Sequence, residues 1–195
     1  MFTGYISDCG RVHYIEKTHN TMRLHIDCAY TDLQQGESIA IDGVCLTVTH
    51  QSAKRFTCDL SPETVQCTRV ADLSIGAFVN LERSLCLSER LNGHVVMAHV
   101  DQTCVVEAKH ILPEYLHYRF SGVEARSQAF LVNKGSIAIN GVSLTLNKVE
   151  DDAFEVMLIP ETLSKTNLGE LLVGDRVNVE YDYFAKLVAK QMSLV

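Results

Sequence analysis

The sequence predicts an all-β protein made of two small closed barrels in tandem, followed by a C-terminal helix. Three features of the 195-residue chain support this prediction. A long segment occurs twice, each copy consists of short apolar or alternating runs between turn residues, and an amphipathic tail follows the second copy. A solenoid needs at least three units to cover its open faces, so each of the two copies should close on itself.

The repeat is clearest in residues 38–47 and 136–145, which share eight of ten residues. The same spacing relates Pro-Glu-Thr at 62–64 to Pro-Glu-Thr at 160–162, and it continues without gaps up to the Val-Asn-x-Glu segments that end at 82 and 180. Chance does not produce such a match. We therefore expect an N-terminal barrel at 1–97, a C-terminal barrel at 98–182 and a helix at 183–195.

Six runs in the first copy have the length and alternation of β-strands. They are Arg11–Ile15, Met22–Ile26, Ser38–Ile41, Cys45–Thr49, Phe56–Leu60 and Ala77–Leu81. Asp42-Gly43 and Asn140-Gly141 predict two-residue hairpin turns, because both central residues of such turns need a positive φ.

Helical signals are few. Short helical turns are expected near Tyr30–Gln35 and Gly122–Val132, and a longer helix over Tyr183–Leu194. In this tail, apolar residues recur on one face, at 184, 187, 188 and 192. The stripe has two interpretations: the helix packs back on its own barrel, or it associates with other copies of the chain.

Composition excludes several classes of function. There are 17 basic against 24 acidic residues, a formal charge of -7, and no basic cluster, so nucleic acid is not an expected partner. No apolar run is long enough to span a membrane and the N-terminus does not resemble a secretion signal, so we expect a cytoplasmic protein with no membrane partner. Seven cysteines without a Cys-x-x-Cys pair disfavour a disulfide framework and a zinc site, and no metal site is expected.

Several ordered motifs together resemble riboflavin synthase of the alpha-chain type. They are the opening Met-Phe-Thr-Gly, the duplicated Gly-Val-Cys/Ser-Leu-Thr and Pro-Glu-Thr blocks, the junction from His94 to Asp101, and Thr166-Asn167-Leu168-Gly169. The resemblance covers nearly the whole chain. It implies two tandem homologous six-stranded antiparallel Greek-key barrels that each bind a lumazine, plus a C-terminal α-helix that holds a homotrimer.

The resemblance also implies an activity. Two molecules of 6,7-dimethyl-8-ribityllumazine would exchange a four-carbon unit, giving riboflavin and 5-amino-6-(D-ribitylamino)uracil without a metal or redox cofactor. The reacting pair would meet where the N-terminal barrel of one subunit faces the C-terminal barrel of its neighbour. An association with lumazine synthase is left open.

Cys45 and Ser143 occupy equivalent positions in the two copies. A thiol is a few per cent ionised at neutral pH and nucleophilic, whereas a hydroxyl is weaker, so the two copies should differ chemically. The alternative is a pair of small strand residues that fill a barrel. His99 is a candidate for moving the 7-methyl proton of the lumazine, because imidazole titrates near neutrality. His94 is interpreted as a satisfied structural residue.

The resemblance completes the set of site residues. The catalytic group comprises Cys45, His99, Ser143, Phe2 and Asp182. Thr47 and Thr145 should share a strand face with Cys45 and Ser143, loops at 59–64 and 159–164 should recognise the pyrimidine edge, and residues 4–6 should lie at the lumazine of the N-terminal barrel. The substrate-binding group comprises Gly4, Tyr5, Ile6, Leu46, Thr47, Asp59, Leu60, Ser61, Pro62, Glu63, Thr64, Ala98, Val100, Lys134, Leu144, Thr145, Ile159, Pro160, Glu161, Thr162, Leu163 and Ser164.

The junction departs from the family pattern at two positions. Asn92 and Ala98 stand where the family has glycine. If the backbone needs a positive φ there, Asn tolerates it but Ala is strained. Two other classes of function remain: a non-catalytic antenna protein that binds a fluorescent lumazine or flavin, and a doubled barrel used only for protein contacts.

Overall fold

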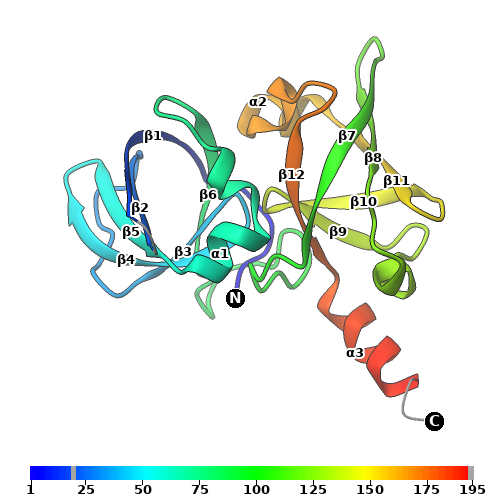
Figure 1. Cartoon of the computed structure of the whole chain (residues 1–195), viewed down its shortest axis with the longest axis horizontal. Coiled ribbons are helices and arrows are strands. Elements are labelled where there is room, and N and C mark those ends of the chain that lie inside the picture. Colours follow the sequence, from blue (N-terminus) through cyan, green and yellow to red (C-terminus); the bar gives the residue numbers. More distant parts are fainter. Residues whose placement is uncertain (19–20, 193–195) are drawn as a thin grey trace.

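Two closed six-stranded antiparallel barrels lie side by side in the computed structural model, and a helix projects from the second (Figure 1). The structure describes residues 1–18 and 21–192. The N-terminal barrel consists of β1 (Asp8–Lys17), β2 (Met22–Asp27), β3 (Ser38–Ile41), β4 (Val44–Ser52), β5 (Arg55–Leu60) and β6 (Phe78–Arg83). The C-terminal barrel consists of β7 (Gln102–Ile111), β8 (Leu116–Ser121), β9 (Ser136–Ile139), β10 (Val142–Val149), β11 (Ala153–Leu158) and β12 (Arg176–Tyr181).

The two barrels have the same topology. The strand order of the first is β1-β2-β5-β4-β3-β6, and the second repeats it with β7 to β12. Because β3, β4 and β5 form consecutive hairpins and β2 returns to pair with β5, each barrel contains a Greek key. All six strands predicted for the first copy are confirmed, and closure leaves neither barrel with an unpaired edge.

Each barrel is filled by its own apolar core. In the N-terminal barrel, Leu24, Ile26, Val48 and Phe56 are completely buried, as the alternation in β2 and β4 requires. A second, separate cluster fills the C-terminal barrel around fully buried Phe154. Since side chains occupy both interiors, a ligand must bind on the outside of the barrels.

The two predicted hairpin turns are confirmed, and they touch each other. Asp42 and Gly43 have φ values of 46° and 74°, and Asn140 and Gly141 have 45° and 78°. A Cβ atom added to Gly43 would lie 2.6 Å from the backbone nitrogen of Gly141. Glycine is therefore required at both tips, because the two turns meet back to back at the contact between the barrels.

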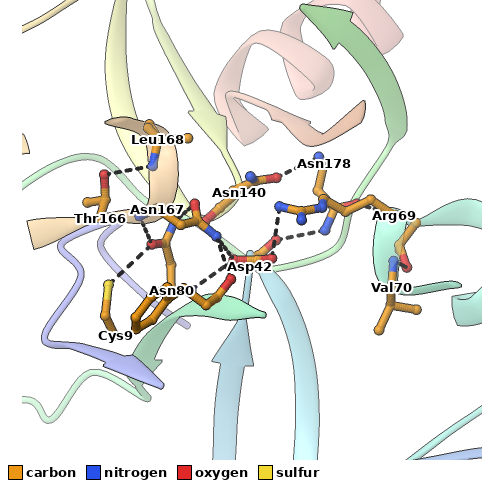
Figure 2. A network of polar contacts seen from close by, with 12 residues as sticks. Cys9, Asp42, Arg69, Val70, Asn80, Asn140, Thr166, Asn167, Leu168 and Asn178 are labelled. Carbon is orange, nitrogen blue, oxygen red and sulfur yellow. Dashed lines mark hydrogen bonds and ion pairs between the residues drawn. The ribbon is translucent and has the colours of Figure 1, made fainter. Parts of the chain in front are cut away.

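A buried polar network surrounds this contact (Figure 2). The Asn80 side chain donates to the Asn140 carbonyl, and the Asn178 side chain donates to the Asp42 carbonyl, each at 2.9 Å. Burial raises the pKa of Asp42, and the Arg69 guanidinium, whose nitrogen lies 3.2 Å from the Asp42 carboxylate, lowers it. Each barrel thus hydrogen-bonds the turn of the other, which holds the two in a fixed arrangement.

The Pro-Glu-Thr segments, expected to be turns within loops, form short helices. These are α1 (Pro62–Cys67) and α2 (Pro160–Lys165), and each begins with its proline. Proline suits this position, because the first turn of a helix does not use its N–H groups and a fixed φ favours helix entry.

Two other local predictions differ in outcome. The helical turn expected near Tyr30–Gln35 is wrong: the segment is irregular and ends in a turn at 35–36. The one near Gly122–Val132 is present as a 3-10 helix, η2 (Ala125–Phe130). Two further 3-10 helices, η1 (Arg69–Asp72) and η3 (Asn167–Glu170), follow α1 and α2.

The tail forms α3 (Tyr183–Met192), and residues 193–195 lie outside the described residues. Its apolar stripe is exposed: Phe184 and Val188 are 59% and 60% accessible. The helix therefore does not bury this stripe on its own barrel, and self-association stays a prediction. The described residues contain no helix long and apolar enough to cross a membrane.

Candidate active site

Cys45 and Thr47 lie on the outer face of β4, and Ser143 and Thr145 lie on the outer face of β10. Cys45 and Ser143 are half-buried, while Thr47 and Thr145 are exposed. Their neighbours on these strands point inward: Leu46 belongs to the first core, and Leu144 packs against the second. The prediction that Thr47 and Thr145 share a strand face with Cys45 and Ser143 is confirmed. The alternative, that Cys45 and Ser143 fill the barrels, is wrong. Leu46 and Leu144 can contact a ligand only through their backbone.

Two extended segments lie over these strands. We call residues 2–6 the N-terminal strap and residues 96–100 the junction strap. The Cys45 amide donates to the Ala98 carbonyl at 2.8 Å, and the Ser143 amide donates to the Gly4 carbonyl at 2.8 Å. Val100 packs on the N-terminal core and Ile6 joins the C-terminal core. Each strap therefore precedes one barrel in the chain but lies on the other.

This exchange corrects one prediction. Gly4, Tyr5 and Ile6 were expected at the lumazine of the N-terminal barrel, yet they lie at Ser143 on the C-terminal barrel. Sequence order favoured the barrel that follows residues 4–6 directly. The chain instead runs across the barrel contact before β1 begins.

A buried carboxylate fastens each strap. Glu82 on β6 accepts from the amides of Thr3 and Gly4 at 2.7 and 3.0 Å, and Glu180 on β12 accepts from those of Met97 and His99 at 2.7 and 2.9 Å. Burial raises the pKa of both carboxyls, that of Glu180 to about 7. From the sequence, both glutamates were recognisable only as part of the repeat. The available signal was an acidic residue within an apolar strand.

Gly4 and Ala98 are equivalent positions of the two straps. Both have a positive φ, 75° at Gly4 and 57° at Ala98. Glycine adopts this region freely, whereas alanine pays about 1–2 kcal/mol for it. Of the two departures noted at the junction, Ala98 is thus the strained one.

Phe2 lies between the straps rather than in an open site. It is 1% exposed and packs with Ala40, Val96, Ala98 and Ala138. Its amide donates to the Val96 carbonyl at 2.8 Å, and the Val96 amide donates back at 3.1 Å. The Phe2 ring therefore packs between the straps. It was predicted to belong to the catalytic group, but its burial keeps it out of contact with a ligand.

Ser143 is joined to His94 by a hydrogen bond. The His94 Nδ1 atom lies 2.8 Å from the Ser143 Oγ atom, and the buried Nε2 atom has no partner among the described residues. Burial lowers the pKa of His94, while Asp182 raises it. His94 is thus buried, as a structural histidine would be, but only one of its two ring nitrogens has a partner among the described residues. A buried neutral imidazole on a hydroxyl is an arrangement that can move a proton.

A cleft of about 140 Å³ opens beside Ser143. The helix α2 supplies Thr162 and Lys165, and the Lys165 Nζ atom lies 6.0 Å from the centre of the Tyr5 ring. Gly93 gives the cleft room, since a Cβ atom there would lie 2.6 Å from the Ser143 Cβ atom. Hydroxyls, an aromatic ring and the ion pair of Lys165 with Glu161 around one cleft suit a planar, polar heterocycle.

The site around Cys45 has the corresponding parts with different chemistry. Burial raises the pKa of the Cys45 thiol, so less of it is ionised at neutral pH than an ordinary thiol would be. Ser61 caps α1 by accepting from the Thr64 amide at 3.1 Å, and the side chain of His99, within the junction strap, is exposed.

The other residues expected in the two loops serve mainly the helices and cores. Leu60 is buried in the first core and Leu163 packs against the second. Ile159 is the exposed N-cap of α2, and the Ser164 hydroxyl donates to the Glu161 carbonyl at 3.0 Å. Pro62 and Pro160 begin the helices, and Glu63 lies exposed in the first turn of α1.

Besides Glu63, three charged residues of the expected set lie outside the lining of the Ser143 cleft. Asp59 pairs with Arg23 at 2.6 Å on the barrel surface, and this hydrogen bond lowers the pKa of Asp59. Asp182 accepts from the Phe184 amide at 2.9 Å and caps α3. Lys134 is exposed in the turn before β9, with a φ of 67°.

Known proteins match the chain over nearly its full length. The family model described as the lumazine binding domain matches residues 3–84 and again residues 97–182. A riboflavin synthase of Bacillus subtilis (strain 168) is 38% identical over 188 residues, which cover 95% of this chain and 87% of that protein. One of Chlamydia pneumoniae is 40% identical over 190 residues, 96% of this chain and 92% of that protein.

Solved structures agree with the fold. A crystal structure of LumP complexed with riboflavin has a TM-score of 0.83 at 25% identity and covers 93% of this chain and 99% of its own. A structure of LumP complexed with 6,7-dimethyl-8-(1'-D-ribityl) lumazine gives 0.82 at 25% identity, with 92% and 98% covered. The doubled barrel is thus similar to a protein crystallised with a flavin in one structure and with a lumazine in another.

Proposed function

The chain belongs to the riboflavin synthase family and is an enzyme of the transferase class, and from this premise we propose a dismutation of two molecules of 6,7-dimethyl-8-ribityllumazine. One lumazine gives a four-carbon unit to the other, which yields riboflavin and 5-amino-6-(D-ribitylamino)uracil. The atoms of two lumazines account for both products, so the reaction needs no external oxidant or reductant.

The observation that best supports this proposal is the doubled site with unlike groups. Each barrel presents an outer strand face, a strap and a short helix, but one strand offers Cys45 and the other Ser143. Two identical substrates in opposite roles need two similar binding sites with different chemistry. A duplicated barrel that has diverged at this position meets that requirement.

We place the reacting pair between subunits of a homotrimer, with the N-terminal barrel of one copy facing the C-terminal barrel of the next. The exposed stripe of α3 supports self-association, and the outward faces of β4 and β10 leave both sites open to a neighbour. Holding two planar rings in register supplies most of the rate, up to about 7–11 kcal/mol.

Proton transfer would add about 10²–10⁴-fold. We assign it to His99 beside Cys45 and to the Ser143–His94 pair, one for each lumazine. One takes a proton from a 7-methyl group, whose carbanion is delocalised into the pteridine ring, and the other supplies a proton later. Thr47 and Thr145 would hydrogen-bond the ring edges, since their hydroxyls both donate and accept.

The N-terminal turns of α1 and α2 would recognise the pyrimidine edge through Thr64, Thr162 and the backbone. The exposed Lys134 would contact substrate from the C-terminal barrel, and Asp182 would orient His94, whose pKa its charge raises.

The direct test is to incubate the purified protein with 6,7-dimethyl-8-ribityllumazine alone and to follow both products. Riboflavin and the aminouracil should form in equal amounts. A folded oligomer that forms neither, or a coloured monomer that keeps one lumazine per chain, would contradict the proposal. The antenna alternative is not favoured, because the riboflavin synthases above are 38% and 40% identical whereas LumP is 25% identical.

Two further parts of the proposal concern the surroundings of the enzyme. We propose a cytoplasmic location, because all seven cysteines are free and thiols persist in a reducing compartment. An association with lumazine synthase, which would supply the substrate, remains a prediction that co-sedimentation of the two proteins can test.

A further inference from the structure

We propose that Glu180 is a positioning residue for the Cys45 site: its carboxylate clamps the junction strap on both sides of Ala98 and so fixes where the strap meets β4. The proposal deepens the assigned reaction and rests on it only for the expected effect on turnover. The effect on the geometry around Cys45 is independent of the reaction.

The contacts form a direct path from one barrel to the other. Glu180 lies on β12, is 3% exposed, and uses one carboxylate oxygen for the Met97 amide and the other for the His99 amide. Between these two amides, the Ala98 carbonyl accepts from the Cys45 amide at 2.8 Å. A residue of the C-terminal barrel thus sets the strap that borders the site of the N-terminal barrel.

The strap at Ala98 needs such a clamp more than its counterpart does. Ala98 holds a φ of 57°, which an alanine left to itself would abandon for a negative value. Gly4 adopts its φ of 75° without this penalty. Both oxygens of Glu180 accept, so glutamine cannot replace it: an amide has one accepting oxygen, and its NH₂ group would face a backbone N–H.

The surroundings of Glu180 couple this clamp to α3 and to the thiol. Asp101, Lys186 and Cys45 are the charged or titratable groups that interact with it electrostatically. Lys186 on α3 binds the Asp101 carboxylate at 2.8 and 3.0 Å. Burial and, to a smaller extent, Asp101 raise the pKa of Glu180, Lys186 lowers it, and the resulting value is about 7. Proton uptake near neutrality therefore weakens one of the two strap bonds.

The experiment compares Glu180→Gln with the matched variant Glu82→Gln in the full chain. The rate of Cys45 alkylation by iodoacetamide is followed by mass spectrometry of its peptide at a fixed, mildly alkaline pH. Glu180→Gln should alkylate about threefold faster or more, because loss of the charge favours the thiolate and loss of one strap bond uncovers it. Glu82→Gln should leave the Cys45 rate unchanged, since Glu82 holds the other strap.

Turnover gives a second readout. In Glu180→Gln, kcat should fall about tenfold, as expected when a site is held less exactly. In the wild-type protein, protonation of Glu180 should make kcat fall as the pH drops below about 7, and this fall should be absent in Glu180→Gln. A folded Glu180→Gln protein with wild-type alkylation would overturn the proposal. So would equal acceleration by Glu82→Gln.

If Glu180→Gln does not fold, Lys186→Met decides. The Lys186→Met protein keeps Glu180 but lacks the cation that favours the ionised Glu180 carboxylate. The fall of kcat at low pH should therefore begin at a higher pH than in the wild type. An unchanged pH profile would overturn the proposal. Faster Cys45 alkylation in Glu180→Gln, together with a wild-type protein that makes no riboflavin, would leave the positioning role in place and refute the proposed function.

Discussion

The N-terminal and C-terminal barrels use the same backbone parts and different side chains. In each, an outer strand face, a strap clamped by a buried glutamate and a short helix begun by proline lie together. At the first, the proposed reactive groups are the Cys45 thiol and the exposed His99 of the junction strap; at the second, they are the Ser143 hydroxyl and the buried His94 that is hydrogen-bonded to it. The helices differ as well, because α2 carries Lys165 where α1 has Cys67.

The comparison of the two barrels shows which residues of a duplicated site can differ between its copies. The turns, clamps and strap contacts position the backbone, and a change there would move everything they hold. The side chains of Cys45 and Ser143, which face outward from β4 and β10, do not hold the straps, because both residues bind the straps through their backbone amides. They are free to diverge, and they give the two sites unequal chemistry.

The strongest test of the shared scaffold is the contact between the two turns. Gly43→Ala and Gly141→Ala would place a Cβ atom 2.6 or 2.7 Å from the opposite backbone nitrogen, at a positive φ. We expect each to lower the free energy of unfolding by about 3 kcal/mol, measured with urea. Gly36→Ala is the control, because its φ is 89° but no atom lies within 4 Å; it should cost about 1 kcal/mol. Equal losses in all three would show that the contact is not tight.

Substitutions of the reactive groups should separate the two sites. Ser143→Ala removes the hydrogen bond to His94 and should lower kcat about 10²-fold, whereas Cys45→Ala should cost about tenfold, since the buried thiol is mostly protonated. Steady-state turnover measures both. His94→Gln should add little to Ser143→Ala if the two act as a unit. Equal losses from Cys45→Ala and Ser143→Ala would contradict the inequality of the sites.

The two clamps should differ in pH dependence. The folded-state pKa of Glu180 is raised to about 7, so the folded chain holds this proton more tightly than the unfolded chain does. Its contribution to stability is therefore lost as pH rises from about 4.5 to about 7. Glu180→Gln should remove this decline from the free energy of unfolding, measured with urea at a series of pH values. An unchanged slope in Glu180→Gln would refute the assignment.

The smallest expected effect concerns the strap backbone. Ala98→Gly should raise the free energy of unfolding by about 0.5 kcal/mol, because relief of the left-handed strain exceeds the loss of a buried methyl group. Gly4→Ala is the reverse change and should destabilise, since its Cβ atom would lie 2.6 Å from that of Ser143. Thermal unfolding measures both. A less stable Ala98→Gly protein would show that packing outweighs strain at this position.

The barrels could be predicted because their signals are local. Strand alternation and the Asp-Gly and Asn-Gly turns depend on neighbouring residues, and the repeat shows each of these patterns a second time. The short helices α1 and α2 could not be recognised, because six residues do not establish a helical period.

The exchanged straps could not be predicted, and they account for most errors at the site. Residues 2–6 could cover either barrel as far as the sequence shows, and only the buried contacts of Ile6 and Phe2 decide. The partner of His94 could not be predicted for the same reason, because Ser143 lies far along the chain.

The exchange of straps has a consequence for the origin of the chain. Each half fastens its leading strap with its own glutamate but lays the strap on a strand of the other half, as subunits of a two-fold dimer do when they swap their ends. The contacts that the Gly4 and Ala98 carbonyls make could exist between separate, identical halves, and the linking residues 84–95 add the hydrogen bond between His94 and Ser143. Fusion also lets the two sequences diverge. Once the halves are joined in one chain they no longer need to be identical, and one could keep a thiol while the other kept a hydroxyl.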